Sequence, residues 1–127
     1  MRALVVDDSR TMRTIMARHL HDLGVEVHEA RTGLEGLTAL RRIGKTDLVM
    51  IDWNMPEMDG FELLRRIRAE SEFDETRLMM VTTESEMANV ACALEAGANE
   101  YLMKPFDREA LLEKLLLLGF DPNELAA

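Results

Sequence analysis

One stretch of this sequence has a clear internal order: Leu48-Val49-Met50-Ile51-Asp52-Trp53-Asn54-Met55-Pro56-Glu57-Met58-Asp59-Gly60. It begins with four apolar residues in a row, a pattern typical of a strand buried on both faces of a parallel sheet. The run ends at Asp52, and Pro56 and Asp59-Gly60 then indicate a turn. We therefore expect Asp52 at the carboxyl end of a buried strand, the edge of an open α/β sheet where ligands bind. Taken alone, Asp52 is equally consistent with an aspartate that caps or solvates a turn.

Similar apolar runs occur on both sides of this stretch, and each is followed by apolar residues at helical spacing. The expected strands are 3–6, 25–29, 48–51, 78–81 and 101–103, and the expected helices contain 12–23, 34–43, 61–67, 87–94 and 111–118. Ser9 and Asp107 are candidate helix N-caps. Five alternations with short loops predict an α/β fold, a (βα)5 flavodoxin-like three-layer sandwich whose five-stranded parallel sheet has the order 2-1-3-4-5.

Composition narrows the classes of function. The chain has 127 residues, 47% of them hydrophobic, and we expect residues 1–127 to form a single domain. The formal net charge of −9 argues against a nucleic-acid partner, and no apolar run reaches the roughly 18 residues of a membrane span. The lone Cys92 excludes an internal disulfide and is predicted to be a small core residue. These features favour a cytoplasmic protein.

Polar residues follow four of the five expected strands, and they are Asp7, Asp8, Asp52, Thr82 and Lys104. In the predicted order, the strand without such a residue, 25–29, lies outside the crevice formed by the first and third strands. Three crowded carboxylates need a cation, and hard oxygen ligands suit Mg²⁺. Mg²⁺, a lysine and an aspartate nucleophile are the groups with which a protein forms an aspartyl phosphate. The alternative is that these residues cap helices and that Lys104 is a surface charge.

The residues that follow the strands, with the segments 52–56, 58–60 and 104–106, resemble the receiver domain of two-component response regulators over almost the whole chain. The segment 53–56 and Tyr101 are similar to the CheY-like single-domain chemotaxis regulators of that family. The resemblance implies that Asp52 accepts a phosphoryl group from a histidine kinase (CheA-like) or from acetyl phosphate. It implies autocatalytic phosphorylation and self-dephosphorylation only, so the chain would not be an enzyme.

The resemblance assigns a role to each site residue. The implied metal ligands for Mg²⁺ are Asp8, Asp52, the backbone carbonyl of Asn54 and, mainly through water, Asp7. Lys104 would pair first with Asp52 and then with the phosphoryl group. Among the implied switch and tuning residues, Thr82 would move to the phosphate and Tyr101 would swing inward. Asn54 and Glu84 would set the rate of self-dephosphorylation. The peptide bond before Pro105 would be cis.

The implied output is a changed surface on 87–94, 101–103 and 111–118, because phosphorylation adds about −1.5 to −2 charge. The implied partner is a flagellar motor switch protein or a phosphotransfer protein, in chemotaxis or motility. Leu115 to Leu118 form an apolar row wider than one buried stripe, which indicates either a wide core face or a docking face. We expect a monomer, with a dimer through the last helix as the alternative.

Other readings remain open. The chain ends soon after the last helix, so we expect no DNA-binding output domain, although a receiver fragment of a larger regulator fits equally. A phosphorelay intermediate would pass the phosphate to a phosphotransfer histidine. A haloacid-dehalogenase-type phosphohydrolase is expected to carry a second aspartate where this chain has Asn54, and a pure scaffold would lack a residue of the acidic group. Arg65, Arg66 and Arg68 are predicted to lie on a solvated face.

Overall fold

The computed structural model describes residues 1–121 and contains one parallel sheet of five strands in the order β2-β1-β3-β4-β5. The strands are β1 Arg2–Val6, β2 Glu26–Ala30, β3 Leu48–Asp52, β4 Arg77–Thr82 and β5 Glu100–Met103. The α-helices are α1 Arg10–Asp22, α2 Gly33–Ile43, α3 Gly60–Arg68, α4 Val90–Glu95 and α5 Arg108–Leu117, and two 3₁₀ segments are η1 Ser71–Phe73 and η2 Glu84–Asn89. The predicted fold class and strand order are confirmed.

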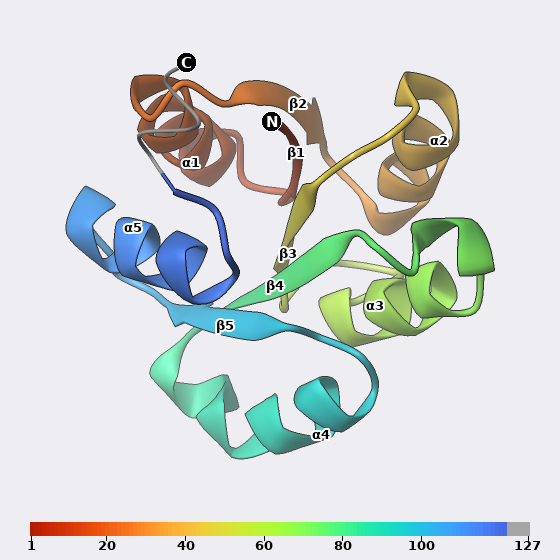
Figure 1. The fold of residues 1–127 in the computed structure, drawn as a ribbon. Helices are drawn as coiled ribbons and strands as arrows, with labels where there is room; N and C mark the ends of the chain where they lie inside the picture. The colour runs from red at the N-terminus through yellow and green to blue at the C-terminus, as the bar shows by residue number, and fades with distance from the viewer. Residues whose placement is uncertain (122–127) are drawn as a thin grey trace.

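The sheet is the middle of three layers (Figure 1). Helices α1 and α5 cover one face, and α2, α3 and α4 cover the other. All five residues of β3 are buried, and their side chains alternate between the two cores. This explains the unbroken apolar run, because a strand covered on both faces has no solvent side on which polar residues would alternate.

Side-chain caps fix where the helices begin after the strands. The Ser9 hydroxyl accepts a hydrogen bond from the Met12 N–H at 3.2 Å, and the Asp107 carboxylate accepts one from the Ala110 N–H at 2.8 Å. Both predicted N-caps are therefore confirmed. Each cap closes a loop that leaves the carboxyl end of a strand, so the same residues that start the helices also fix that edge of the sheet.

The segment after β4 differs from the predicted helix 87–94. It begins as the 3₁₀ segment η2, and only Val90–Glu95 is α-helical. A capping box begins this 3₁₀ segment directly after β4. In it, the Glu86 carboxylate accepts a hydrogen bond from the Thr83 N–H at 2.8 Å. The short helix buries only Val90 and Ala93. Cys92 lies on the outer face and is exposed, so its prediction as a core residue was wrong.

A part-buried polar network joins the loops at the amino end of the sheet. Arg68 donates to the carbonyl oxygens of Gly97 at 2.9 Å, Phe73 at 2.8 Å and Thr76 at 2.8 Å, and to Asn99 Oδ1 at 2.8 Å. Its assignment to a solvated face was wrong, because it lies one turn beyond Leu64 on the side of α3 that faces these loops. Arg65 and Arg66 are exposed, as expected.

The leucine row of α5 is not one wide core face. Leu115 is fully buried, whereas Leu116 and Leu117 are 52% and 66% exposed. In the part of the chain that the structure describes, no helix has the length and apolar character needed to span a lipid bilayer.

Candidate functional site

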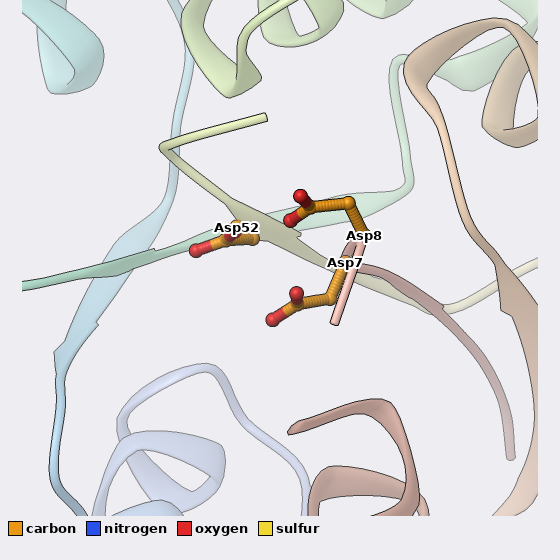
Figure 2. A group of neighbouring side chains, drawn as sticks. All are labelled: Asp7, Asp8 and Asp52. Carbon is orange, nitrogen blue, oxygen red and sulfur yellow. The ribbon is translucent and has the colours of Figure 1, made fainter. Parts of the chain in front are cut away.

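Three carboxylates meet where β1 and β3 end side by side. Asp7 and Asp8 directly follow β1, Asp52 is the last residue of β3, and the two strands are paired up to Val6 opposite Ile51. One carboxylate oxygen from each aspartate lies within 4.8 Å of the others. Figure 2 shows the three side chains extending in the same direction from the strand ends. The parallel sheet thus brings together residues that lie 44 positions apart in sequence, the difference between 8 and 52.

Lys104 reaches this cluster from the end of β5. Its ammonium donates to Asp52 Oδ1 at 2.9 Å and to Asp7 Oδ2 at 3.5 Å. The Lys104 side chain is 19% exposed, so solvent screens the two contacts only partly. The Lys104-Pro105 peptide bond is cis. One ammonium faces three carboxylates, which leaves the site with an excess of negative charge.

This charge arrangement changes the acidity of both partners. Burial, together with the negative charges of Asp7 and Asp8, raises the pKa of Asp52 to about 6, although the Lys104 ammonium opposes the rise. Burial lowers the pKa of Lys104, but the hydrogen bonds and charges of Asp52 and Asp7 outweigh it, so the net pKa is raised. The lysine therefore stays charged at neutral pH. The pKa of Asp52 is close enough to neutral pH that a second cation in the site would favour its ionised form.

The donor atoms fit a hard divalent cation. Asp8 is exposed, and its carboxylate makes no hydrogen bond or ion pair to any other residue in 1–121. Asp7 keeps one oxygen on the Ser9 N–H at 2.8 Å and turns the other toward Lys104. A set made only of carboxylate oxygens, without histidine or cysteine, suits Mg²⁺ rather than zinc. Asn54 lies in the exposed loop two residues after Asp52.

Thr82 and Tyr101 make no hydrogen bond or ion pair with the three aspartates. The Thr82 side chain is fully buried at the end of β4, and its hydroxyl donates to the sulfur of Met87 at 3.7 Å. The Tyr101 ring is half-buried, and the Lys114 ammonium lies 4.0 Å from its centroid. Glu84 is exposed at the start of η2. The structure thus brings together the three aspartates and Lys104, and it leaves Thr82, Tyr101 and Glu84 without a hydrogen bond or ion pair to them.

Two residues position the site in ways that were not predicted from the sequence, in which Gly60 was expected only to mark a turn and Arg13 was not singled out. A Cβ atom on Gly60 would lie 2.4 Å from the Asp52 carbonyl oxygen, so only glycine allows α3 to begin this close to the strand end. Arg13 is buried in α1, and its guanidinium donates to the Asp7 carbonyl oxygen at 2.7 Å. The signal was an arginine at helical spacing from buried Met16 and Leu20, on the face that packs against the sheet.

Comparison with known proteins adds an independent line of observation. A family model, the response regulator receiver domain, matches residues 3–116. The chemotaxis protein CheY1 of Helicobacter pylori is 47% identical over 121 residues, which cover 94% of this chain and 98% of that protein. A chemotaxis protein CheY homologue of Campylobacter jejuni is 45% identical over 129 residues, covering 100% of this chain and 99% of the relative.

Solved structures agree with these sequence matches. The chemotaxis protein CheY4 of Vibrio cholerae has a TM-score of 0.84 and 36% identity, covering 91% of this chain and 95% of that one. A two-component system response regulator/GGDEF domain protein has a TM-score of 0.87 and 31% identity. The match covers all of this chain but 51% of that longer protein.

Proposed function

This chain belongs to the response regulator receiver domain family, and from that premise we propose that Asp52 is its phosphoacceptor. With relatives 47% and 45% identical over nearly their full length, it is a CheY-like response regulator of chemotaxis, a signalling protein rather than an enzyme. The observation that carries the proposal is the Asp52 carboxylate, which lies 2.9 Å from the Lys104 ammonium and in one cluster with Asp7 and Asp8.

The chemistry is a phosphoryl transfer onto oxygen. A carboxylate oxygen of Asp52 forms a bond to phosphorus while the bond to the donor, a phosphohistidine nitrogen or an acetyl phosphate oxygen, breaks. The Lys104 ammonium, already beside Asp52, pairs with the phosphoryl oxygens. Water later cleaves the acyl phosphate, which restores the carboxylate and releases inorganic phosphate. Asn54 and Glu84, in the loops that flank Asp52 and Thr82, tune that decay.

We propose that Mg²⁺ is bound by Asp8, Asp52, the backbone carbonyl of Asn54 and, mainly through water, Asp7. When bound, the ion neutralises the charge on the transferring phosphoryl group. The excess of carboxylates over ammonium groups, the exposed Asp8 and the oxygen-only donor set support this assignment.

The output of the switch follows from the added charge and acceptor oxygens. The Thr82 hydroxyl exchanges the Met87 sulfur for a phosphoryl oxygen, and Tyr101 turns inward behind it. The surface of α4, β5 and α5 changes with them, and it carries the exposed apolar side chains Leu94, Met103, Leu116 and Leu117. We propose a CheA-like histidine kinase as the donor. The receiving partner is a flagellar motor switch protein, or a phosphotransfer protein in a phosphorelay.

Residues 1–127 are proposed to act as a single receiver domain, monomeric and cytoplasmic, with a dimer through α5 as the alternative. The match to half of a response regulator/GGDEF protein supports a second possibility, that the same domain serves as the receiver of a larger regulator.

The test is incubation with acetyl phosphate, with and without Mg²⁺, followed by intact-mass measurement of the wild type and Asp52→Asn. We expect one phosphoryl group that requires Mg²⁺, is absent from the variant and decays after the donor is removed. Trp53, which adjoins Asp52 and stacks on Phe61 with ring centroids 5.8 Å apart, reports Mg²⁺ binding by fluorescence in the same sample. Equal labelling of the variant, or none in the wild type, would overturn the assignment of Asp52.

A further inference from the structure

We propose that Arg13 is a positioning residue for the acidic site. By holding the backbone carbonyl of Asp7, it fixes the peptide from which Asp8 projects, and so it sets the affinity of the site for Mg²⁺. The inference rests on the proposed function, since it concerns the cation that the three carboxylates are proposed to bind.

The contacts of Arg13 aim its guanidinium at one backbone atom. The residue lies in α1 and is 8% exposed. Its Nη1 donates to the Asp7 carbonyl oxygen at 2.7 Å, a charge-assisted hydrogen bond. Its Nε lies 3.4 Å from Glu29 Oε1 at the end of β2, which compensates the charge. Arg13 therefore ties the end of β1 to both α1 and β2.

Every other polar group of Asp7 also has a hydrogen-bond partner. Its N–H donates to the Ala30 carbonyl oxygen at 3.1 Å, and its carboxylate accepts from the Ser9 N–H at 2.8 Å and from Lys104 at 3.5 Å. Asp7 is fully buried. Without Arg13, its carbonyl oxygen would lose its charged partner, so the peptide would have to turn to find another.

Asp8 depends on this arrangement more than Asp7 does. Its N–H belongs to the same peptide unit as the Asp7 carbonyl, whereas its own carboxylate makes no hydrogen bond or ion pair with another side chain in residues 1–121. No partner side chain holds that carboxylate, so the backbone, which fixes the Cα–Cβ direction, is what aims it toward the cluster. A rotation of the Asp7–Asp8 peptide would move Asp8 away from Asp7 and Asp52 and weaken the shared cation site.

A positioning role for Arg13 and simple electrostatics predict opposite changes in Mg²⁺ affinity when Arg13 is replaced. Arg13 is a cation near an acidic cluster, so removing its charge should by Coulomb's law favour the binding of another cation. Loss of positioning should instead weaken binding, since residues that orient metal ligands typically contribute about 10- to 100-fold in affinity. The direction of the change thus separates the two effects.

The experiment is a Mg²⁺ titration of the full chain, followed by Trp53 fluorescence, for the wild type, Arg13→Met, Arg13→Lys and Arg18→Met. Arg18 is exposed on the same helix, so its variant removes the same charge without the contact to Asp7. We expect about 10-fold weaker binding in Arg13→Met, with partial rescue in Arg13→Lys. Arg18→Met should bind as tightly as the wild type or slightly more tightly. Thermal unfolding of each variant is measured in parallel.

Unchanged or tighter Mg²⁺ binding by folded Arg13→Met would overturn the proposal, even if its melting temperature fell, because a purely structural role lowers stability without changing the affinity of the folded protein. If Arg13→Met does not fold, Arg13→Lys decides the question: binding as tight as the wild type overturns the proposal, and weaker binding supports it. Failure of the proposed function would look different, since the wild type itself would neither bind Mg²⁺ nor take up a phosphoryl group.

Discussion

The two ends of the sheet differ in how completely their charged groups are paired. At the amino end, the single guanidinium of Arg68 has an acceptor for each of its donating groups, in three carbonyl oxygens and the Asn99 side chain. At the carboxyl end, one ammonium contacts two of three clustered carboxylates, and within residues 1–121 the buried hydroxyl of Thr82 has a sulfur atom as its acceptor.

This difference separates the part of the molecule that stabilises the fold from the part that performs chemistry. A fully satisfied buried network is rigid and costly to disturb. A cluster with uncompensated charge lowers stability, but it is ready to bind a cation and an anionic group. Breaking either end should therefore have opposite consequences for stability and for phosphorylation.

The largest effect is expected from Arg68→Met at the amino end. It leaves several part-buried acceptors unsatisfied, and we expect a loss of roughly 3 kcal/mol in the free energy of unfolding. Denaturant unfolding measures the loss, and Arg65→Met on the exposed side of α3 is the control. The rate of labelling by acetyl phosphate at low temperature, where the variant is folded, should stay unchanged. A large fall in that rate would show that the two ends are coupled.

The next effect is the pH dependence of phosphorylation at the carboxyl end. In the proposed reaction the attacking group is the ionised Asp52, whose pKa is raised to about 6 mainly by burial. At low Mg²⁺ concentration, the labelling rate should therefore fall below pH 6, by about tenfold for each further pH unit. Saturating Mg²⁺ favours the carboxylate and should move the midpoint to lower pH. Intact-mass time courses from pH 4.5 to pH 8, a range chosen around the raised pKa, test this, and a midpoint that ignores Mg²⁺ would contradict it.

Asp52→Asn should stabilise the protein at neutral pH. The folded-state pKa of about 6 lies above the ordinary value, so between about pH 4 and 6 the folded protein keeps a proton that the unfolded chain has lost. The free energy of unfolding of the wild type therefore falls as pH rises through that window, whereas the variant lacks this fall. The gain is the cost of keeping a carboxylate ionised in a mostly buried site beside Asp7 and Asp8, and we expect it to be on the order of 1 kcal/mol above pH 7, since solvent screens part of that cost.

That gain should vanish below about pH 4, where Asp52 is protonated in both states. Urea unfolding at several pH values measures it, with Glu95→Gln on the exposed side of α4 as the control. A variant that is less stable than the wild type at pH 7 would show that the Lys104–Asp52 ion pair contributes more stability than the crowded carboxylates cost.

The smallest effect is expected from Met87→Leu, which removes the sulfur that accepts the Thr82 hydroxyl. The unphosphorylated state loses a weak hydrogen bond, while the phosphorylated state, in which Thr82 bonds the phosphate, loses nothing. We expect the acetyl phosphate concentration for half-maximal labelling to fall about twofold, in line with a difference of a few tenths of a kcal/mol. The same substitution in a Thr82→Val background should have no effect, and an equal shift there would exclude the Thr82–Met87 contact as the cause.

The acidic group was predictable from sequence because two regular patterns combine in it. Asp7, Asp8 and Asp52 each come directly after a run of apolar residues, and parallel strands place all such positions at one edge. The order of the strands then brought the first and third together. Local patterns and chain topology were sufficient, and no side-chain detail was needed to place these carboxylates.

Arg13 and Arg68 were not predictable in the same way. An arginine on a helix is usually solvated, and its guanidinium can reach acceptors that lie many residues away, such as Gly97 for Arg68. The 3₁₀ segment η2 was missed for a related reason: the apolar spacing that suggested a helix from Met87 includes a side chain that instead contacts Thr82. Contacts of single long side chains are decided by tertiary packing, which periodicity does not encode.

The close packing of Gly60 against Asp52 restricts the direction in which the residues around Asp52 can move. The start of α3 lies against the Asp52 backbone with no room for a β-carbon, and the Gly60 N–H donates to the Trp53 carbonyl oxygen at 2.9 Å. On its other side Asp52 pairs with Val81 of β4, and the 3₁₀ segment η2 follows that strand. For the proposed phosphorylation of Asp52, we therefore expect displacement toward η2 and α4, because the Gly60 contact leaves no room for movement toward α3.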